Sequence, residues 1–199
     1  MAAILVPFRG AEGKRRLAPA TPEARASIGL AMLADVLSAC VPVAPTTLLS
    51  DDEAAAAVAA EVGVEVVAEL PPGQGAAVRA ALRRLEAAPV AVVNADLPCL
   101  VPDDVRELLR ALPPRGIALA PAADGTTNAL ALADPALFRP LYGPGSAARF
   151  LALPVPATTV ERPNLVDDVD TLEDLRRLER RAGPRTQMAL AMAGLVAVA

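Results

Sequence analysis

The sequence contains no histidine and very few aromatic residues, and each scarcity excludes a class of function. Without histidine, the chain cannot build a His-ligated zinc site, a Ser-His-Asp triad or a Cys-His nucleophile pair. Aromatic residues make up 2% of the chain, which leaves no stacking platform for single-stranded nucleic acid. Carboxylates, hydroxyls, backbone amides, lysine and arginine must therefore carry any chemistry.

Cysteine and surplus positive charge are also scarce. Cys40 and Cys99 are too few for a disulfide framework, and neither lies in a metal-binding Cys-x-x-Cys pair. The formal net charge of -4 argues against binding to duplex nucleic acid, which requires clustered lysine and arginine. These features favour a cytoplasmic protein without a nucleic-acid partner.

Apolar residues, by contrast, make up 54% of the 199-residue chain, which is enough for the core of one domain. Short apolar runs alternate with segments of helical periodicity, a pattern typical of an α/β sandwich with a mostly parallel central sheet and right-handed crossovers. Thr21-Pro22-Glu23 combines an N-cap, a proline and an early acid, so it predicts a helix start. The predicted strands are 2–6, 46–49, 64–67, 90–93, 117–119, 128–132 and 155–160, and the predicted helices are 22–39, 76–85, 102–112, one between Asp52 and Gly63, and one from Thr171.

The C-terminal segment is apolar but short. Residues 188–199 cannot span a bilayer, which requires roughly 20 apolar residues, so no membrane partner is expected. We interpret them as a helix that packs on the domain or forms an oligomer contact, so a homodimer is one expectation. The alternatives are a frayed tail or the remainder of a longer fused chain. Because Gly183-Pro184 suits a boundary, we expect one domain over residues 1–183 and an apolar tail over 184–199.

Two groups of acids have positions that suit a metal. The segment Asn94-Ala95-Asp96-Leu97-Pro98 directly follows the apolar run 90–93, so Asp96 lies at the carboxyl end of a strand, where open α/β sheets bind their ligands. A carboxylate there could hold Mg²⁺ on nucleotide phosphates, or it could merely cap the turn before Pro98. Asp168 and Asp170 point to the same face of an extended segment. The alternative for this pair is that Asp170 or Thr171 caps the following helix.

Cations and small residues offer sites for anions. Arg9, Lys14 and Arg16 lie in the loop after the first strand, where they could neutralise a triphosphate or form a solvated charge run. The segments 124–128 and 143–146, the second followed by Arg149, could cradle an anion or simply form turns.

Several of these residues belong to motifs that occur in a fixed order. The motifs are Val6-Pro7, Gly13-Lys14-x-Arg16-Leu17, Ala31-Met32-Leu33-x-Asp35-Val36-Leu37, Asp96-Leu97-Pro98, Gly125-Thr126-Thr127-Asn128-Ala129-Leu130, Tyr142-Gly143-Pro144-Gly145-Ser146-Ala147-Ala148-Arg149 and Asp168-Val169-Asp170-Thr171. With them, about residues 2 to 181 resemble the CofC/FbiD guanylyltransferases of coenzyme F-420 biosynthesis, which have a GT-A-like (Rossmann-like) nucleotidyltransferase fold.

This resemblance implies an activity. Such enzymes join GMP from GTP to phosphoenolpyruvate or 2-phospho-L-lactate with Mg²⁺ and release pyrophosphate. Other readings are a sugar-phosphate or molybdopterin nucleotidyltransferase, whose Leu-x-Gly-Gly pattern is missing after the first strand, and a catalytically silent nucleotide-binding subunit, against which the two acidic groups argue.

The resemblance also implies roles for individual residues. The metal would be held by Asp96 and Asp168, with Asp170 beside them. The acceptor acid would be bound by Thr127, Gly143, Ser146 and Arg149. The nucleotide would face Arg9, Lys14, Arg16 and Gln74.

Overall fold

The computed structural model describes residues 1–10, 17, 20–68, 71–85 and 88–195. Its centre is a seven-stranded sheet in the order β3-β2-β1-β4-β6-β5-β7. All neighbouring strands are parallel except β6, which is antiparallel to β4 and β5. The strands are β1 Ala3–Pro7, β2 Thr46–Leu49, β3 Glu65–Val67, β4 Val90–Val93, β5 Ile117–Pro121, β6 Thr127–Leu132 and β7 Ala157–Thr159.

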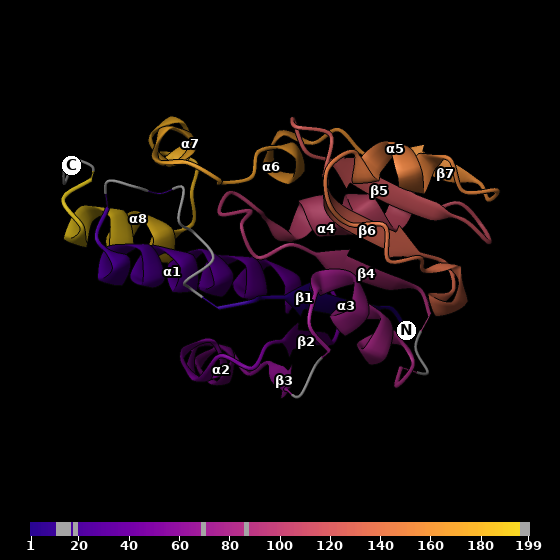
Figure 1. Ribbon diagram of the computed structural model, residues 1–199, viewed down its shortest axis with the longest axis horizontal. Coiled ribbons are helices and arrows are strands. Elements are labelled where there is room, and N and C mark those ends of the chain that lie inside the picture. The colour runs from indigo at the N-terminus through magenta and orange to yellow at the C-terminus, as the bar shows by residue number, and fades with distance from the viewer. Residues whose placement is uncertain (11–16, 18–19, 69–70, 86–87, 196–199) are drawn as a thin grey trace.

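The helices lie on both faces of this sheet (Figure 1), as the alternating sequence pattern predicts. Short helices that the periodicity did not predict follow β6 and β7. The helices are α1 Pro22–Cys40, α2 Glu53–Glu61, α3 Gln74–Leu82, α4 Pro102–Arg110, the 3-10 turn η3 Pro135–Leu137, α5 Ser146–Leu151, α6 Pro163–Val166, α7 Leu172–Leu178 and α8 Pro184–Met192.

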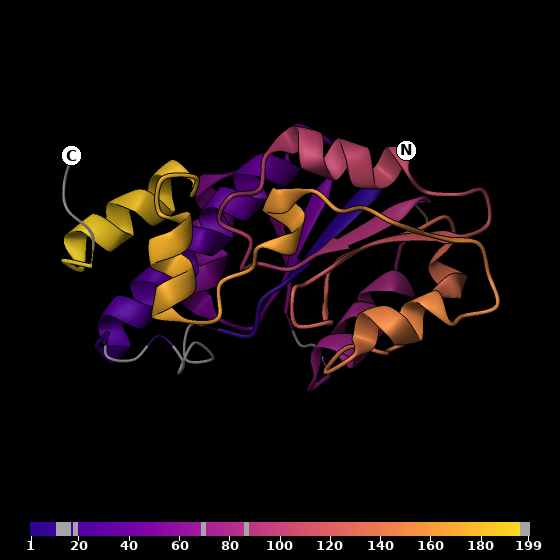
Figure 2. The same cartoon turned by 90° about the horizontal axis from the view of Figure 1, so that it is seen from above.

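Two apolar layers hold the helices to the sheet. One layer packs α1, α2, α4 and α6 on one face, and the other packs α3, η3 and α5 on the opposite face. Figure 2 shows α4 on one side of the sheet and α3 with α5 on the other. Neighbouring residues of β1 alternate between the layers, with Ile4 in the first and Leu5 in the second. A strand buried on both faces has this continuous apolar sequence.

Side-chain caps set the helix starts as the sequence predicts. The hydroxyl of Thr21 accepts the N–H of Ala24 at the start of α1, and Asp52 caps α2 in the same way. Thr171 and Asp174 cap α7 reciprocally. Thr171 therefore performs the capping that the sequence left open between it and Asp170.

The C-terminal segment packs on the rest of the chain. Helix α8 begins at Pro184 and lies along α1 at the end of the molecule that also carries α7 (Figures 1 and 2). The buried carboxylate of Asp35 accepts hydrogen bonds from the Thr186 N–H at 2.8 Å and the Thr186 hydroxyl at 2.7 Å. The helix starts before the expected residue 188 because Asp35 caps it. In the part of the chain that the structure describes, no helix is long and apolar enough to cross a membrane.

Candidate active site

Three aspartates converge at the carboxyl edge of the sheet. Asp96 follows β4, while Asp168 and Asp170 lie in the segment between α6 and α7. One carboxylate oxygen from each lies within 4.8 Å of the others. The Val169 N–H donates to the Asp96 carbonyl at 3.0 Å, which holds the two segments together.

The electrostatics of this group fit a divalent cation. Burial, followed by the negative charge of Asp96, raises the pKa of Asp168 to about 6. Three partly buried carboxylates at this spacing repel one another, and hard divalent cations take such oxygen ligands. The donor set therefore suits a divalent metal.

A β-bulge positions the next two polar residues. Ala120 of β5 pairs with Ala129 of β6, but Pro121 pairs with Thr127, so Asn128 is the extra residue. The bulge changes the directions of the Thr127 and Asn128 side chains from those of a regular strand. The Thr127 hydroxyl lies 3.0 Å from that of Ser146 at the start of α5.

Asn128 turns toward the segment that carries the second aspartate. Its buried amide donates to the carbonyls of Leu165 and Val166, both at 3.0 Å, and to the carboxylate of Asp168 at 3.4 Å. These contacts orient Asp168 relative to the sheet. Sequence reasoning included Asn128 in a motif but gave it no role, because its direction depends on the bulge.

The loop before α5 is held by an arginine. The exposed guanidinium of Arg149 donates to the carbonyls of Pro144 at 2.6 Å and Leu141 at 2.7 Å. Gly143 has a φ of 111°, a conformation that favours glycine. Arg149 therefore shapes the loop that contains Gly143 and ends at Ser146.

A chain of hydrogen bonds links this loop to the other side of the site. Gln74, at the start of α3, donates its amide to the Asn94 side chain at 2.7 Å. Asn94 in turn donates to the Thr127 carbonyl at 3.1 Å. The sequence predicted Gln74 as a nucleotide contact, whereas Asn94 was missed although it immediately follows β4.

Two adjoining hollows open at this edge. The first, of about 260 Å³, is lined by Asp96, Asp170, Arg9 and Gln74 among others. The second, of about 300 Å³, shares Arg9 and Gln74 with the first and extends to Asp51 beside the loop after β3. Together they run from the aspartates past β1 and β2.

The remaining predicted cations cannot be placed. Lys14 and Arg16 lie outside the described residues. Near the start of the loop after β1, Arg9 lines both hollows, and Gly10 lies against Asp52 with a φ of 89°. A side chain at Gly10 would meet the Asp52 carboxylate, so this turn requires glycine.

The fold and the aspartate group define a class of protein. A structure from Desulfovibrio desulfuricans G20, described as a nucleotide-diphospho-sugar transferase, covers 98% of this chain and 96% of its own with a TM-score of 0.78 at 17% identity. Rv0371c from Mycobacterium tuberculosis H37Rv, in a complex with manganese, covers 89% of this chain and 97% of its own with a TM-score of 0.59 at 23% identity. The chain has the single-domain α/β fold of nucleotidyltransferases.

The sequence then identifies the family. Residues 2–154 match the family described as Guanylyl transferase CofC like. A relative from Nocardia farcinica, named phosphoenolpyruvate guanylyltransferase, is 36% identical over 193 residues, which are 90% of this chain and 85% of the relative. The protein belongs to the CofC-like guanylyl transferase family, and the resemblance seen in its motifs is confirmed.

Proposed function

We propose that the protein transfers GMP from GTP to phosphoenolpyruvate and releases pyrophosphate, in coenzyme F-420 biosynthesis. The observation that carries this proposal is the aspartate group, two members of which line the first hollow, Asp96 and Asp170. The name of the relative from Nocardia farcinica supports phosphoenolpyruvate as the acceptor. The fold supports nucleotidyl transfer as the class of reaction.

Each side of the site has a distinct task. Asp96, Asp168 and Asp170 would hold Mg²⁺, which neutralises charge on the phosphates of GTP when it is bound. Arg9, which lines both hollows, with Lys14 and Arg16, would bind the same phosphates. Thr127, Gly143 and Ser146 would bind the acceptor acid, and Arg149 would maintain their loop.

The reaction needs alignment more than proton transfer. A phosphate oxygen of the acceptor forms a bond to the α-phosphorus of GTP while the bond from that phosphorus to the bridging oxygen of pyrophosphate breaks. A phosphate monoester loses its second proton near about pH 6, so the nucleophile is already ionised at neutral pH. Absence of histidine is therefore no obstacle, and the side chains contribute orientation and charge.

The second hollow suits the guanine base. Asp51 lines it beside Pro71 and Gly73, while its neighbour Asp52 caps α2. The exocyclic amino group of guanine can donate a hydrogen bond to a carboxylate. We expect Asp51→Asn to raise KM for GTP about tenfold, with kcat little changed, and to weaken the preference for GTP over ATP. Glu53→Gln, on the exposed first turn of α2, is the control, and equal effects from both variants would contradict this role.

The activity is tested with purified protein, GTP and Mg²⁺, to which phosphoenolpyruvate or 2-phospho-L-lactate is added separately. Pyrophosphate release with phosphoenolpyruvate supports the proposal. Release with only 2-phospho-L-lactate would replace the acceptor but keep the class of reaction. GTP binding without release with either acid would favour a silent nucleotide-binding subunit.

A further inference from the structure

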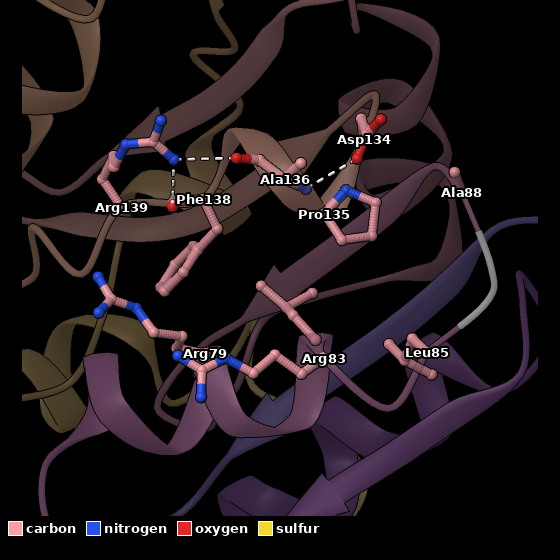
Figure 3. Close-up of a pocket in the computed structure, with 10 residues that line it drawn as sticks. Arg79, Arg83, Leu85, Ala88, Asp134, Pro135, Ala136, Phe138 and Arg139 are labelled. Carbon is pink, nitrogen blue, oxygen red and sulfur yellow. Dashed lines mark hydrogen bonds between the residues drawn. The ribbon is translucent and has the colours of Figure 1, made fainter.

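A third and larger hollow lies away from the aspartate group. Its volume is about 730 Å³, and it opens between α3 and η3 (Figure 3). It shares no lining residue with the two hollows at the carboxyl edge. Ala88, which precedes β4, lines it, whereas Asp96 follows β4 at the opposite end of that strand. The proposed reaction assigns no role to this space.

Arginine side chains form two walls of the hollow. Arg79 of α3 and Arg83, which directly follows the helix, face Arg139 and Asp134 across it (Figure 3). Arg79 and Arg83 are four residues apart, so they occupy the same helix face with their Cβ atoms about 6 Å apart. Arg139 is held on its wall by its hydrogen bonds to the carbonyls of Ala136 and Phe138, both at 2.9 Å.

The guanidinium groups of Arg79 and Arg83 have no partner among the residues that the structure describes. No hydrogen bond or ion pair joins either guanidinium to another described residue, and the bonds that these two residues do make are backbone ones, such as the Arg83 N–H donating to the Arg79 carbonyl at 3.3 Å. Among the lining residues that the structure describes, Asp134 is the single carboxylate, and one of its oxygens already accepts the Ala136 N–H at 2.7 Å. The described lining thus carries three guanidinium groups against one carboxylate, which is an excess of positive charge in a chain whose net charge is -4.

Apolar side chains complete the lining. Leu82 and Leu85 lie on either side of Arg83 in the chain, and Pro135 and Phe138 lie opposite. The ring of Phe138 is buried and lies 6.1 Å from that of Tyr142, which fixes its position. The hollow thus offers cationic and apolar surface together, within the range of about 300 to 1,000 Å³ that small-molecule sites occupy.

We propose that this hollow is a second, non-catalytic binding site for a small organic dianion, either a phosphate monoester or a dicarboxylate on an apolar or ring-shaped body. Arginine binds both kinds of acid through the same pair of parallel N–H bonds. The neighbouring guanidinium groups of Arg79 and Arg83 receive the two charges, and Leu85 and Phe138 contact the apolar body.

The test uses 1-naphthyl phosphate and naphthalene-2,3-dicarboxylate as probes. EDTA is present so that metal-dependent binding at the aspartates does not contribute. The chain has no tryptophan and one tyrosine, so naphthyl fluorescence is read against little protein background. We expect a saturable rise in anisotropy with one probe per chain. Arg83→Gln should weaken it about tenfold, and the Arg79→Gln/Arg83→Gln double variant should weaken it further.

Arg84→Gln is the matched control, because Arg84 is the next residue, is exposed and does not line the hollow. It should change the affinity less than about twofold, and thermal unfolding should show that all variants remain folded. Binding of the phosphate alone, the dicarboxylate alone or both supports the site and identifies which acid it takes. No saturable binding, or equal weakening by Arg83→Gln and Arg84→Gln, would overturn the proposal.

Discussion

At the scale of single residues, Asp96 lies in the loop after β4, and one oxygen of its carboxylate is within 4.8 Å of oxygens of Asp168 and Asp170. We expect Asp96→Asn to lower kcat at least about 100-fold, because an amide cannot supply the charge that a divalent cation requires. Pyrophosphate release measures the loss, and an unchanged circular dichroism spectrum shows that the fold is retained. Activity close to that of the unmodified protein would refute the metal role.

The carboxylate of Asp168, which would hold the metal, is expected to lower the stability of the metal-free protein. Its pKa is raised to about 6, so in the metal-free protein its ionised form destabilises the fold above that pH. This cost is fully present at neutral pH and disappears as the pH falls through about 6 toward the ordinary value of 3.8. We therefore expect Asp168→Asn in EDTA to unfold at a higher temperature than the unmodified protein at about pH 7.5, with a smaller difference at about pH 5.

Asp103→Asn is the control for that comparison. It removes the same charge from a largely exposed side chain of α4 that pairs with Arg106, and exposed pairs contribute about 0–1 kcal/mol. The same variant of Asp168 should also lose its stabilisation by added Mg²⁺. If Asp168→Asn were less stable than the unmodified protein near neutral pH, the ionised carboxylate of Asp168 would not be destabilising, and this prediction would be contradicted.

At the scale of elements, the bulge in β6 links the sheet to the metal group. Asn128 donates to two carbonyls and to the carboxylate of Asp168 in the segment before α7. We expect Asn128→Ala to weaken divalent-metal binding about 10- to 100-fold, the usual effect of removing a group that orients a ligand. Isothermal titration with Mn²⁺ measures the affinity.

Asn164→Ala is the matched control for the bulge. Asn164 also donates from an asparagine amide, at 2.9 Å to Asp104 of α4, which is not a member of the aspartate group. It should lower stability while leaving the metal affinity within about twofold. Similar losses of affinity in both variants would mean that Asn128 acts only through general stability.

At the scale of the whole molecule, α8 is part of the core and not an appendage. Asp35 of α1 caps the N-terminal end of α8, and Leu190 of α8 is buried with Leu172 and Leu175 of α7. We expect Asp35→Ala to lower the free energy of unfolding by about 2–3 kcal/mol, because it removes a charged cap and leaves buried donors unpaired. Urea unfolding measures this loss, and KM for GTP should stay unchanged.

Asp103→Ala, on the exposed face of α4, serves as the matched control and should cost less than about 1 kcal/mol. A similar small cost for Asp35→Ala would mean that α8 is held by its apolar contacts alone.

The packing of α8 also explains why the sequence left several interpretations of the C-terminal segment open. The helix packs on α1, whose Asp35 lies about 150 positions earlier in the chain, and no local pattern relates the two segments.

The sequence by itself determined the strands and the longer helices, the family and the residue types available for chemistry, because periodicity, caps and motifs are local. The resemblance to the CofC/FbiD family also implied that Asp96 and Asp168 would hold one metal. Tertiary structure alone decided where Asn128 and Thr127 point, since the bulge arises from pairing with β5. It likewise decided that Asp35 caps α8 and that Arg79 and Arg83 face Arg139 across a hollow, because these contacts join segments that no local pattern relates.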